Sequence, residues 1–242
     1  MSAGWRSILI GGLALLLVAA CGGPIPTATP APTPTPVPPD GEKVTFVTED
    51  GVTLAGTLYP GGGDLAVVLA HQGVGQTTQS SWRAFAEVAA INGITAFPFN
   101  FRRDFCGPLD QGVLAAIRYL RSRGYTRIAC VGASMGGTSC LKAALTEELL
   151  GVGAIGSNWS TGGGVSLSRE ELASLAMPKL FVTTDKDRFP AVPVSMKEMY
   201  AQAPDPKQFQ EYSGSAQGTE IFSTQHRDEL RTLLFEFLEQ LR

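Results

Sequence analysis

The chain has 242 residues, a formal net charge of −3 and 44% hydrophobic residues. It is long enough to bury a sizeable core. Its weakly acidic charge, with no basic stretch and no basic residues interleaved with aromatic ones, argues against nucleic-acid binding.

The N-terminal segment has the features of an export signal. One positive charge, Arg6, precedes an apolar run from Ile8 to Ala20 that is shorter than the ~20 residues of a membrane-spanning helix. The run ends in Val18-Ala19-Ala20-Cys21, which resembles the cleavage site of a bacterial lipoprotein signal peptide. The resemblance implies that residues 1–20 are removed and that Cys21 carries lipid, so that the exported protein is anchored to a cell membrane on its extracytoplasmic side. The alternative is an ordinary secretory signal with an incidental cysteine.

Residues 21–42 are expected to form a tether. From Pro24 to Pro39 the sequence is almost entirely Pro, Thr and Ala, a composition that favours an extended polyproline II spacer of ~3 Å per residue. Residues 43–242 are then one domain's worth of chain.

The domain begins with two strand-like runs, residues 43–48 and 52–59, joined by the turn signal Asp50-Gly51. The unbroken apolar run Leu65–Ala70 is typical of a central parallel strand. Further strands are expected at residues 94–100, 127–132, 152–157, 180–184 and 207–212, and helices at 81–92, 109–123, 135–149, 168–176, 192–203 and 224–241. This alternation predicts an α/β fold with a mostly parallel sheet, helices on both faces and ligands at the carboxyl ends of the strands.

The pentapeptide Gly132-Ala133-Ser134-Met135-Gly136 stands between a predicted strand and a predicted helix. A serine on such a turn needs glycine on both sides, because the neighbouring elements crowd the backbone. The following helix directs its N-terminal amides at any oxyanion that forms there. We therefore interpret Ser134 as a nucleophile on a strand–turn–helix elbow, the alternative being a plain glycine-rich turn.

Polar residues follow three other predicted strands: His71-Gln72-Gly73, Thr184-Asp185-Lys186-Asp187 and Ser213 to Thr219. The chain order of serine, aspartate and a loop after the last strand resembles that of the α/β-hydrolase superfamily, especially its small dienelactone-hydrolase-like members. The resemblance covers residues 43–242. Because few residues separate Ser134 from Asp187, no sizeable cap domain fits between them.

The resemblance implies a role for each matching residue. Ser134 matches the nucleophile, and the backbone amides of Gly73 and Met135 match the oxyanion hole. Asp187 matches the triad acid, with Asp185 as the alternative. Asp187 could also cap the turn that follows it, and the two roles are compatible.

One position departs from the family pattern. Gln217 stands in the final loop where the resemblance places the catalytic histidine. An amide can form a hydrogen bond with the serine, but it cannot accept the serine proton at any accessible pH, so general-base activation is lost.

The sequence contains two histidines. His71 belongs to the oxyanion turn, where the resemblance implies that it holds the loop by hydrogen bonds. His226 precedes the apolar stripe of the last helix, as a packed or capping residue would. The alternative is that His226 reaches back over the loop as a substitute base.

Three cysteines remain besides Cys21: Cys106, Cys130 and Cys140. Their odd number leaves at least one unpaired, and their spacing indicates neither a disulfide framework nor a metal site. We expect Cys130 and Cys140 to pack as small apolar residues; whether any pair forms a disulfide stays open.

These features predict a membrane-tethered serine hydrolase of the α/β-hydrolase type, impaired by Gln217, that acts on an ester or related acyl compound through Ser134. We expect a monomer with a small-molecule acyl substrate and no cofactor, metal or nucleic acid. The alternative is an inactive hydrolase-fold protein that binds a small ligand or a partner.

Overall fold

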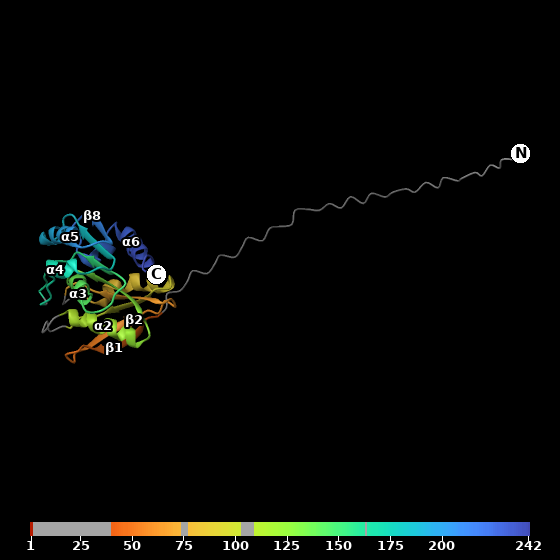
Figure 1. The fold of residues 1–242 in the computed structure, drawn as a ribbon, viewed down its shortest axis with the longest axis horizontal. Helices are drawn as coiled ribbons and strands as arrows, with labels where there is room; N and C mark the ends of the chain where they lie inside the picture. Colours follow the sequence, from red (N-terminus) through yellow and green to blue (C-terminus); the bar gives the residue numbers. More distant parts are fainter. Residues whose placement is uncertain (2–39, 74–76, 103–108, 163) are drawn as a thin grey trace. The chain divides into compact units, whose positions relative to one another are not determined.

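Eight strands form a single sheet in the computed structural model of this chain (Figure 1). In chain order they are β1 (Glu42–Val47), β2 (Thr53–Leu58), β3 (Leu65–Ala70), β4 (Thr95–Phe99), β5 (Arg127–Ala133), β6 (Val152–Ile155), β7 (Lys179–Thr184) and β8 (Lys207–Tyr212). Across the sheet the order is β1-β2-β4-β3-β5-β6-β7-β8. β1 pairs antiparallel with β2 and β2 antiparallel with β4, whereas all other neighbours are parallel.

The structure describes residues 1, 40–73, 77–102, 109–162 and 164–242. Apart from Met1, these residues belong to one compact unit, Pro36–Arg242. The predicted signal peptide, Cys21, most of the predicted tether and Cys106 lie outside the described residues.

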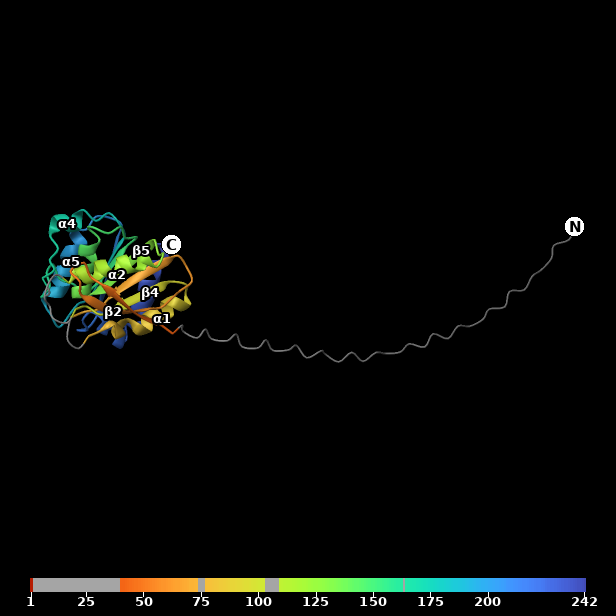
Figure 2. The ribbon, with the colours of Figure 1, turned by 90° about the horizontal axis from the view of Figure 1, so that it is seen from below.

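Helices cover both faces of the sheet (Figure 2). They are α1 (Arg83–Ile91), α2 (Asp110–Ser122), α3 (Met135–Ala143), α4 (Arg169–Ala173), α5 (Ala191–Gln202) and α6 (Arg227–Glu239), with short 3₁₀ helices η1 (Gln79–Trp82) and η2 (Gly218–Ser223). Alternate residues of β3 enter the two cores: Ala66 and Val68 pack with α2 to α5, and Leu65 and Val67 pack with α1 and α6. Every residue of β3 is buried, which explains its unbroken apolar run.

The predicted elements are present, but two helices end clearly earlier than expected. The helix expected over residues 168–176 covers only Arg169–Ala173. The helix after the elbow was expected to reach Leu149, but α3 ends at Ala143. The backbone then forms turns in which the Thr146 hydroxyl donates to the Ala143 carbonyl, and such a local bond competes with the helical ladder. Arg118 and Arg121 of α2 bind the Glu147 carboxylate in this segment.

Cys130 and Cys140 form a disulfide, so the expectation that they only pack as small apolar residues is incomplete. The bond joins β5 to α3 across 10 residues of sequence, with Cα atoms 5.7 Å apart. The two cysteines meet because the elbow folds α3 back against β5. The disulfide therefore closes a small covalent loop around Ser134.

Replacing both cysteines (Cys130→Ala with Cys140→Ala) should lower the free energy of unfolding by about 2–3 kcal/mol. The disulfide restricts the unfolded chain, and for a closed loop of this size the lost restriction is worth about that much. Urea unfolding of the variant and the oxidised wild type measures the difference. Equal midpoints, or alkylation of both thiols in the unreduced, denatured wild type, would contradict the bond's presence or its contribution.

Candidate active site

Ser134 lies at the junction of β5 and α3 with φ 50 and ψ −118. It is the one residue other than glycine with positive φ among the described residues, a conformation that is sterically costly for a side chain with a Cβ. Its backbone is held on both sides: its N–H donates to the Ile155 carbonyl at 2.7 Å, and its carbonyl accepts from the Ser157 hydroxyl at 2.9 Å. A strained, firmly held serine of this kind is the geometry expected of a nucleophile elbow.

The glycines around Ser134 are required by close backbone contacts. A Cβ on Gly132 would lie 2.2 Å from the carbonyl carbon of Gly136, and one on Gly136 would lie 2.4 Å from the carbonyl oxygen of Ala70. The β5–α3 turn is therefore packed directly against the end of β3. This contact brings the serine next to the loop that contains the predicted oxyanion residue.

The loop after β3 contains Gly73, which has φ 45, and is held by His71. The Phe101 N–H donates to His71 Nε2 at 3.2 Å, so Nδ1 carries the proton and donates to the Gln72 carbonyl at 2.9 Å. Burial lowers the pKa of His71, which favours this neutral form. His71 thus fixes the loop and is not free to act as a base. On the other side of the serine, Met135 is the first residue of α3, where a helix leaves amides without intrahelical partners.

Gln72 connects the β3 loop to the final loop, a link that its sequence separation conceals. Its side-chain oxygen accepts from the Thr219 N–H at 2.6 Å and from the Thr219 hydroxyl at 3.0 Å. A Cβ on the intervening Gly218 would lie 2.1 Å from the Gln72 oxygen and 3.1 Å from Cβ of Ala133. The final loop is therefore pinned against both the β3 loop and the elbow.

Gln217, at the position of the expected histidine, is buried at 2% exposure. Its side-chain Nε2 donates to the Gly156 carbonyl at 2.7 Å, just beyond the strand that binds the backbone of Ser134. Its own N–H donates to Glu220 at 3.3 Å. The amide has a defined partner, and an amide side chain offers no basic nitrogen at this position.

The two candidate acids differ sharply in their surroundings. Asp187 is 4% exposed; one carboxylate oxygen accepts from the Phe189 N–H at 2.9 Å, and the other is buried with no partner among the described residues. Burial raises the pKa of Asp187. Asp185 is exposed and accepts from the Gly214 N–H at 2.8 Å. Asp187 is the carboxylate with an unused, buried oxygen.

His226 immediately precedes α6, and both of its ring nitrogens have partners. Its Nε2 lies 3.1 Å from the Ser213 hydroxyl and its Nδ1 lies 2.9 Å from the Glu229 carboxylate. The ring stacks on Tyr212, with centroids 4.9 Å apart. The His226 ring thus binds one residue of the final loop, Ser213, and one residue of the first turn of α6, Glu229.

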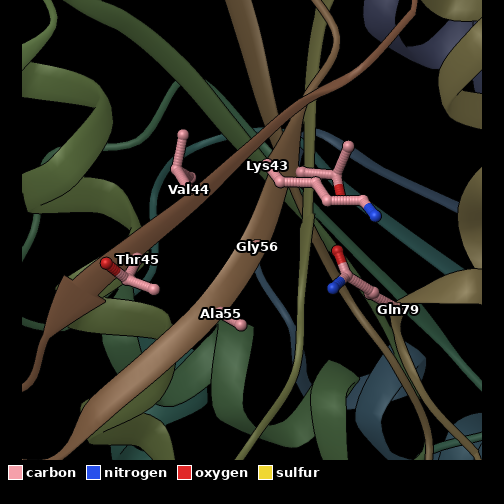
Figure 3. A pocket seen from close by; sticks show the side chains of 7 residues that line it. Lys43, Val44, Thr45, Ala55, Gly56 and Gln79 are labelled. Atoms are coloured by element: carbon pink, nitrogen blue, oxygen red, sulfur yellow. The ribbon is translucent and has the colours of Figure 1, made fainter.

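Other places in the fold offer less chemistry. A surface pocket of about 300 Å³ lies over β1 and β2, with Lys43 and Gln79 near one another at one end and Thr45 and Ala55 toward the other (Figure 3). None of the predicted site residues lines it. In the described part of the chain no three His, Cys, Asp or Glu side chains are placed to hold a metal, and no helix has the length and apolarity of a membrane span.

The sequence and the structure compare differently with known proteins. Neither a protein-family profile nor a curated protein matches the sequence. The structure matches an esterase from Pyrococcus furiosus with a TM-score of 0.69 and 16% identity, over 83% of this chain and 91% of that one. It matches a dienelactone hydrolase from Anabaena variabilis with a TM-score of 0.68 and 18% identity, over 83% of this chain and 98% of that one. It also matches a thermophilic esterase from Thermogutta terrifontis with a TM-score of 0.66 and 13% identity, over 83% of this chain and 99% of that one. The chain has the α/β-hydrolase fold.

The expected fold class is therefore confirmed, with a mostly parallel sheet covered by helices on both faces. Between Ser134 and Asp187 the described residues form α3, β6, the short α4 and β7, and they contain no cap domain. Ser134, Asp187 and Gln217 each follow the carboxyl end of a parallel strand, where ligands of open α/β sheets bind.

Replacing Asp187 with asparagine should stabilise the fold at pH 7 by on the order of 1 kcal/mol, because it removes a buried charge whose second oxygen has no partner among the described residues. A raised pKa means that the folded state penalises the ionised form. The advantage of Asp187→Asn should shrink as the pH falls through the folded pKa, where the wild-type carboxyl becomes neutral. Urea unfolding at several pH values measures it; a variant less stable than wild type at pH 7 would indicate a partner for the carboxylate.

Proposed function

We propose that the chain is an extracytoplasmic serine hydrolase of the α/β-hydrolase type that acts slowly on ester or related acyl compounds through Ser134. The observation that carries the proposal is the strained backbone of Ser134 at the β5–α3 elbow, held between the β3 loop and the final loop. Strain of this kind persists only where the surroundings enforce it, and it is concentrated at active sites. The esterases and the dienelactone hydrolase with the same fold support an acyl substrate.

In the proposed reaction the Ser134 hydroxyl attacks the acyl carbonyl. The backbone amides of Gly73 and Met135 stabilise the oxyanion, which collapses as the bond to the leaving alcohol breaks and the alcohol departs. Water later hydrolyses the acyl–serine bond, which releases the carboxylic acid and restores the Ser134 hydroxyl. Asp187 would orient a base at position 217, but Gln217 cannot accept the serine proton. The proton must then leave to solvent, and the remaining acceleration comes from the oxyanion site and from binding, which in a serine protease without its triad is worth ~10³–10⁴ over water.

One observation favours a second function. The Gln217 amide is buried and hydrogen-bonded to the Gly156 carbonyl, so the base position is filled by a well-accommodated residue and not left as a gap. Such a site would bind a small carbonyl ligand or a partner without turnover.

Hydrolysis of p-nitrophenyl acetate by the wild type and by Ser134→Ala separates the two functions. If the protein is a hydrolase, the wild type should turn over slowly but faster than Ser134→Ala. Equal rates, together with saturable protection of the wild type against thermal unfolding by a non-hydrolysable carbonyl compound, would favour the binding protein.

The proposed location rests on the sequence Val18-Ala19-Ala20-Cys21. If Cys21 is lipidated, Cys21→Ser should leave an uncleaved precursor or release the protein from the membrane fraction, because anchoring needs the acyl chains. Fractionation of cells that express each form, followed by immunoblotting, measures this. A Cys21→Ser protein that is still processed and membrane-bound would refute the anchor.

A further inference from the structure

A second hydroxyl–imidazole–carboxylate chain lies on the surface of the fold, formed by Ser213 after β8, His226 before α6 and Glu229 in the first turn of α6. The Ser213 hydroxyl is 3.1 Å from His226 Nε2, and His226 Nδ1 is 2.9 Å from the Glu229 carboxylate. These are the contacts by which a base activates a serine and a carboxylate orients the base. Among the described residues, none of the three forms a hydrogen bond with Ser134.

The ring of His226 is held in one orientation and one tautomer. Tyr212 stacks on the His226 ring at an interplanar angle of 25°. The His226 side chain is only 14% exposed. Because the Glu229 carboxylate accepts from Nδ1, the proton of neutral His226 lies on Nδ1 and Nε2 carries the lone pair. The side-chain amide nitrogen of Gln225 lies 3.4 Å from His226 Nε2. An amide nitrogen only donates, so this contact also requires Nε2 to be the unprotonated nitrogen. Nε2 is thus an acceptor for the Ser213 proton.

Glu229 does not perform the capping role that its position suggests. It is the third residue of α6, from which a glutamate commonly reaches back to the N–H of the capping residue. Here the His226 N–H donates instead to the Thr224 hydroxyl at 3.1 Å, and the Glu229 carboxylate binds the imidazole. Ser213 itself is exposed, so an acyl donor can reach its hydroxyl.

We propose that Ser213 is a second nucleophile of this protein, activated by His226 and accessible to activated acyl compounds. In the acylation step the Ser213 oxygen forms a bond to the acyl carbon and the bond to the leaving alcohol breaks. The hydroxyl proton passes to His226 Nε2, and the leaving group departs as the alcohol or its anion. His226 is the base in this step, and Glu229 is a positioning residue that keeps the proton on Nδ1.

Ser215 provides an internal control. It is an exposed serine of the same loop, two residues from Ser213, and no histidine among the described residues forms a hydrogen bond with its side chain. Both serines lie in the same tryptic peptide. A single experiment therefore compares an activated hydroxyl with an ordinary one after the same treatment with reagent.

The experiment uses the full chain with Ser134→Ala, treated with p-nitrophenyl acetate, quenched in acid and mapped by peptide mass spectrometry. The proposal expects at least tenfold more acetyl on Ser213 than on Ser215, within the range that general-base catalysis supplies. His226→Gln should reduce Ser213 acetylation to the Ser215 level. Replacing the exposed Glu229 (Glu229→Gln) should reduce Ser213 acetylation severalfold. It should also shift the ¹⁵N resonances of the His226 ring away from those of the Nδ1–H tautomer. Equal acetylation of both serines, or acetylation of Ser213 that survives His226→Gln, would overturn the proposal.

Discussion

Gln217→His should increase the rate of p-nitrophenyl acetate hydrolysis at least 100-fold over the wild type. A histidine at this position would supply the general base that the amide cannot, and such catalysis is worth ~10²–10⁴. Ser134 is held in its strained conformation, and Asp187 has a buried carboxylate oxygen without a partner among the described residues. We propose that this oxygen accepts from the new imidazole and orients it. Steady-state kinetics at pH 7.5 to 8 give the comparison.

Two controls locate the effect. The gain should disappear when Ser134→Ala is combined with Gln217→His, and it should fall strongly with Asp187→Asn. The rival hypothesis, that His226 already serves Ser134, expects the reverse pattern. It requires a fast wild-type rate that is abolished by His226→Gln, with little gained at position 217.

Gly132→Ala should destabilise the fold by on the order of 3 kcal/mol, because the added methyl has no space to occupy. Its Cβ would lie 2.2 to 2.5 Å from three backbone atoms of Gly136 and Gly137. Backbone atoms of a packed helix cannot move aside as the end of a flexible side chain can. The elbow must therefore open, and urea unfolding monitored by circular dichroism should report the loss.

Gly162→Ala is the matched control for this substitution. Gly162 has no positive φ, and a Cβ built there meets nothing within 4 Å. Its replacement should change the free energy of unfolding by less than about 0.5 kcal/mol. Equal stability of Gly132→Ala and Gly162→Ala would contradict the tight packing of the elbow.

The fold could be predicted from local pattern because each element has a distinct periodicity. β3 and β8 have the expected bounds, Leu65–Ala70 and Lys207–Tyr212, since turn residues delimit both runs. The end of α3 could not be predicted, because helix propensity continues past Ala143 while contacts with α2 decide the path of the chain. Tertiary context often overrides propensity in this way.

The site was predictable where a motif fixes a backbone shape, as at Ser134, and not where residues distant in sequence meet. The Gln72–Thr219 hydrogen bonds join residues 147 positions apart, and no spacing rule indicates them. Whether Cys130 and Cys140 pair could not be decided from the sequence for a related reason: cysteine counting does not reveal that the elbow brings β5 and α3 together. Likewise, the sequence indicates a packed or capping His226, with a base for Ser134 as the alternative; its contact with Ser213 could not be predicted, because it depends on the path of the final loop.

The most direct test of the central claim, a nucleophile site complete in shape but without a base, is the rate of fluorophosphonate labelling of Ser134. The protein is mapped by peptide mass spectrometry so that Ser134 and Ser213 are counted separately. We expect slow labelling of Ser134 in the wild type and labelling at least 100-fold faster in Gln217→His, within the range of general-base catalysis. Wild-type labelling of Ser134 as fast as that of Gln217→His would contradict the claim.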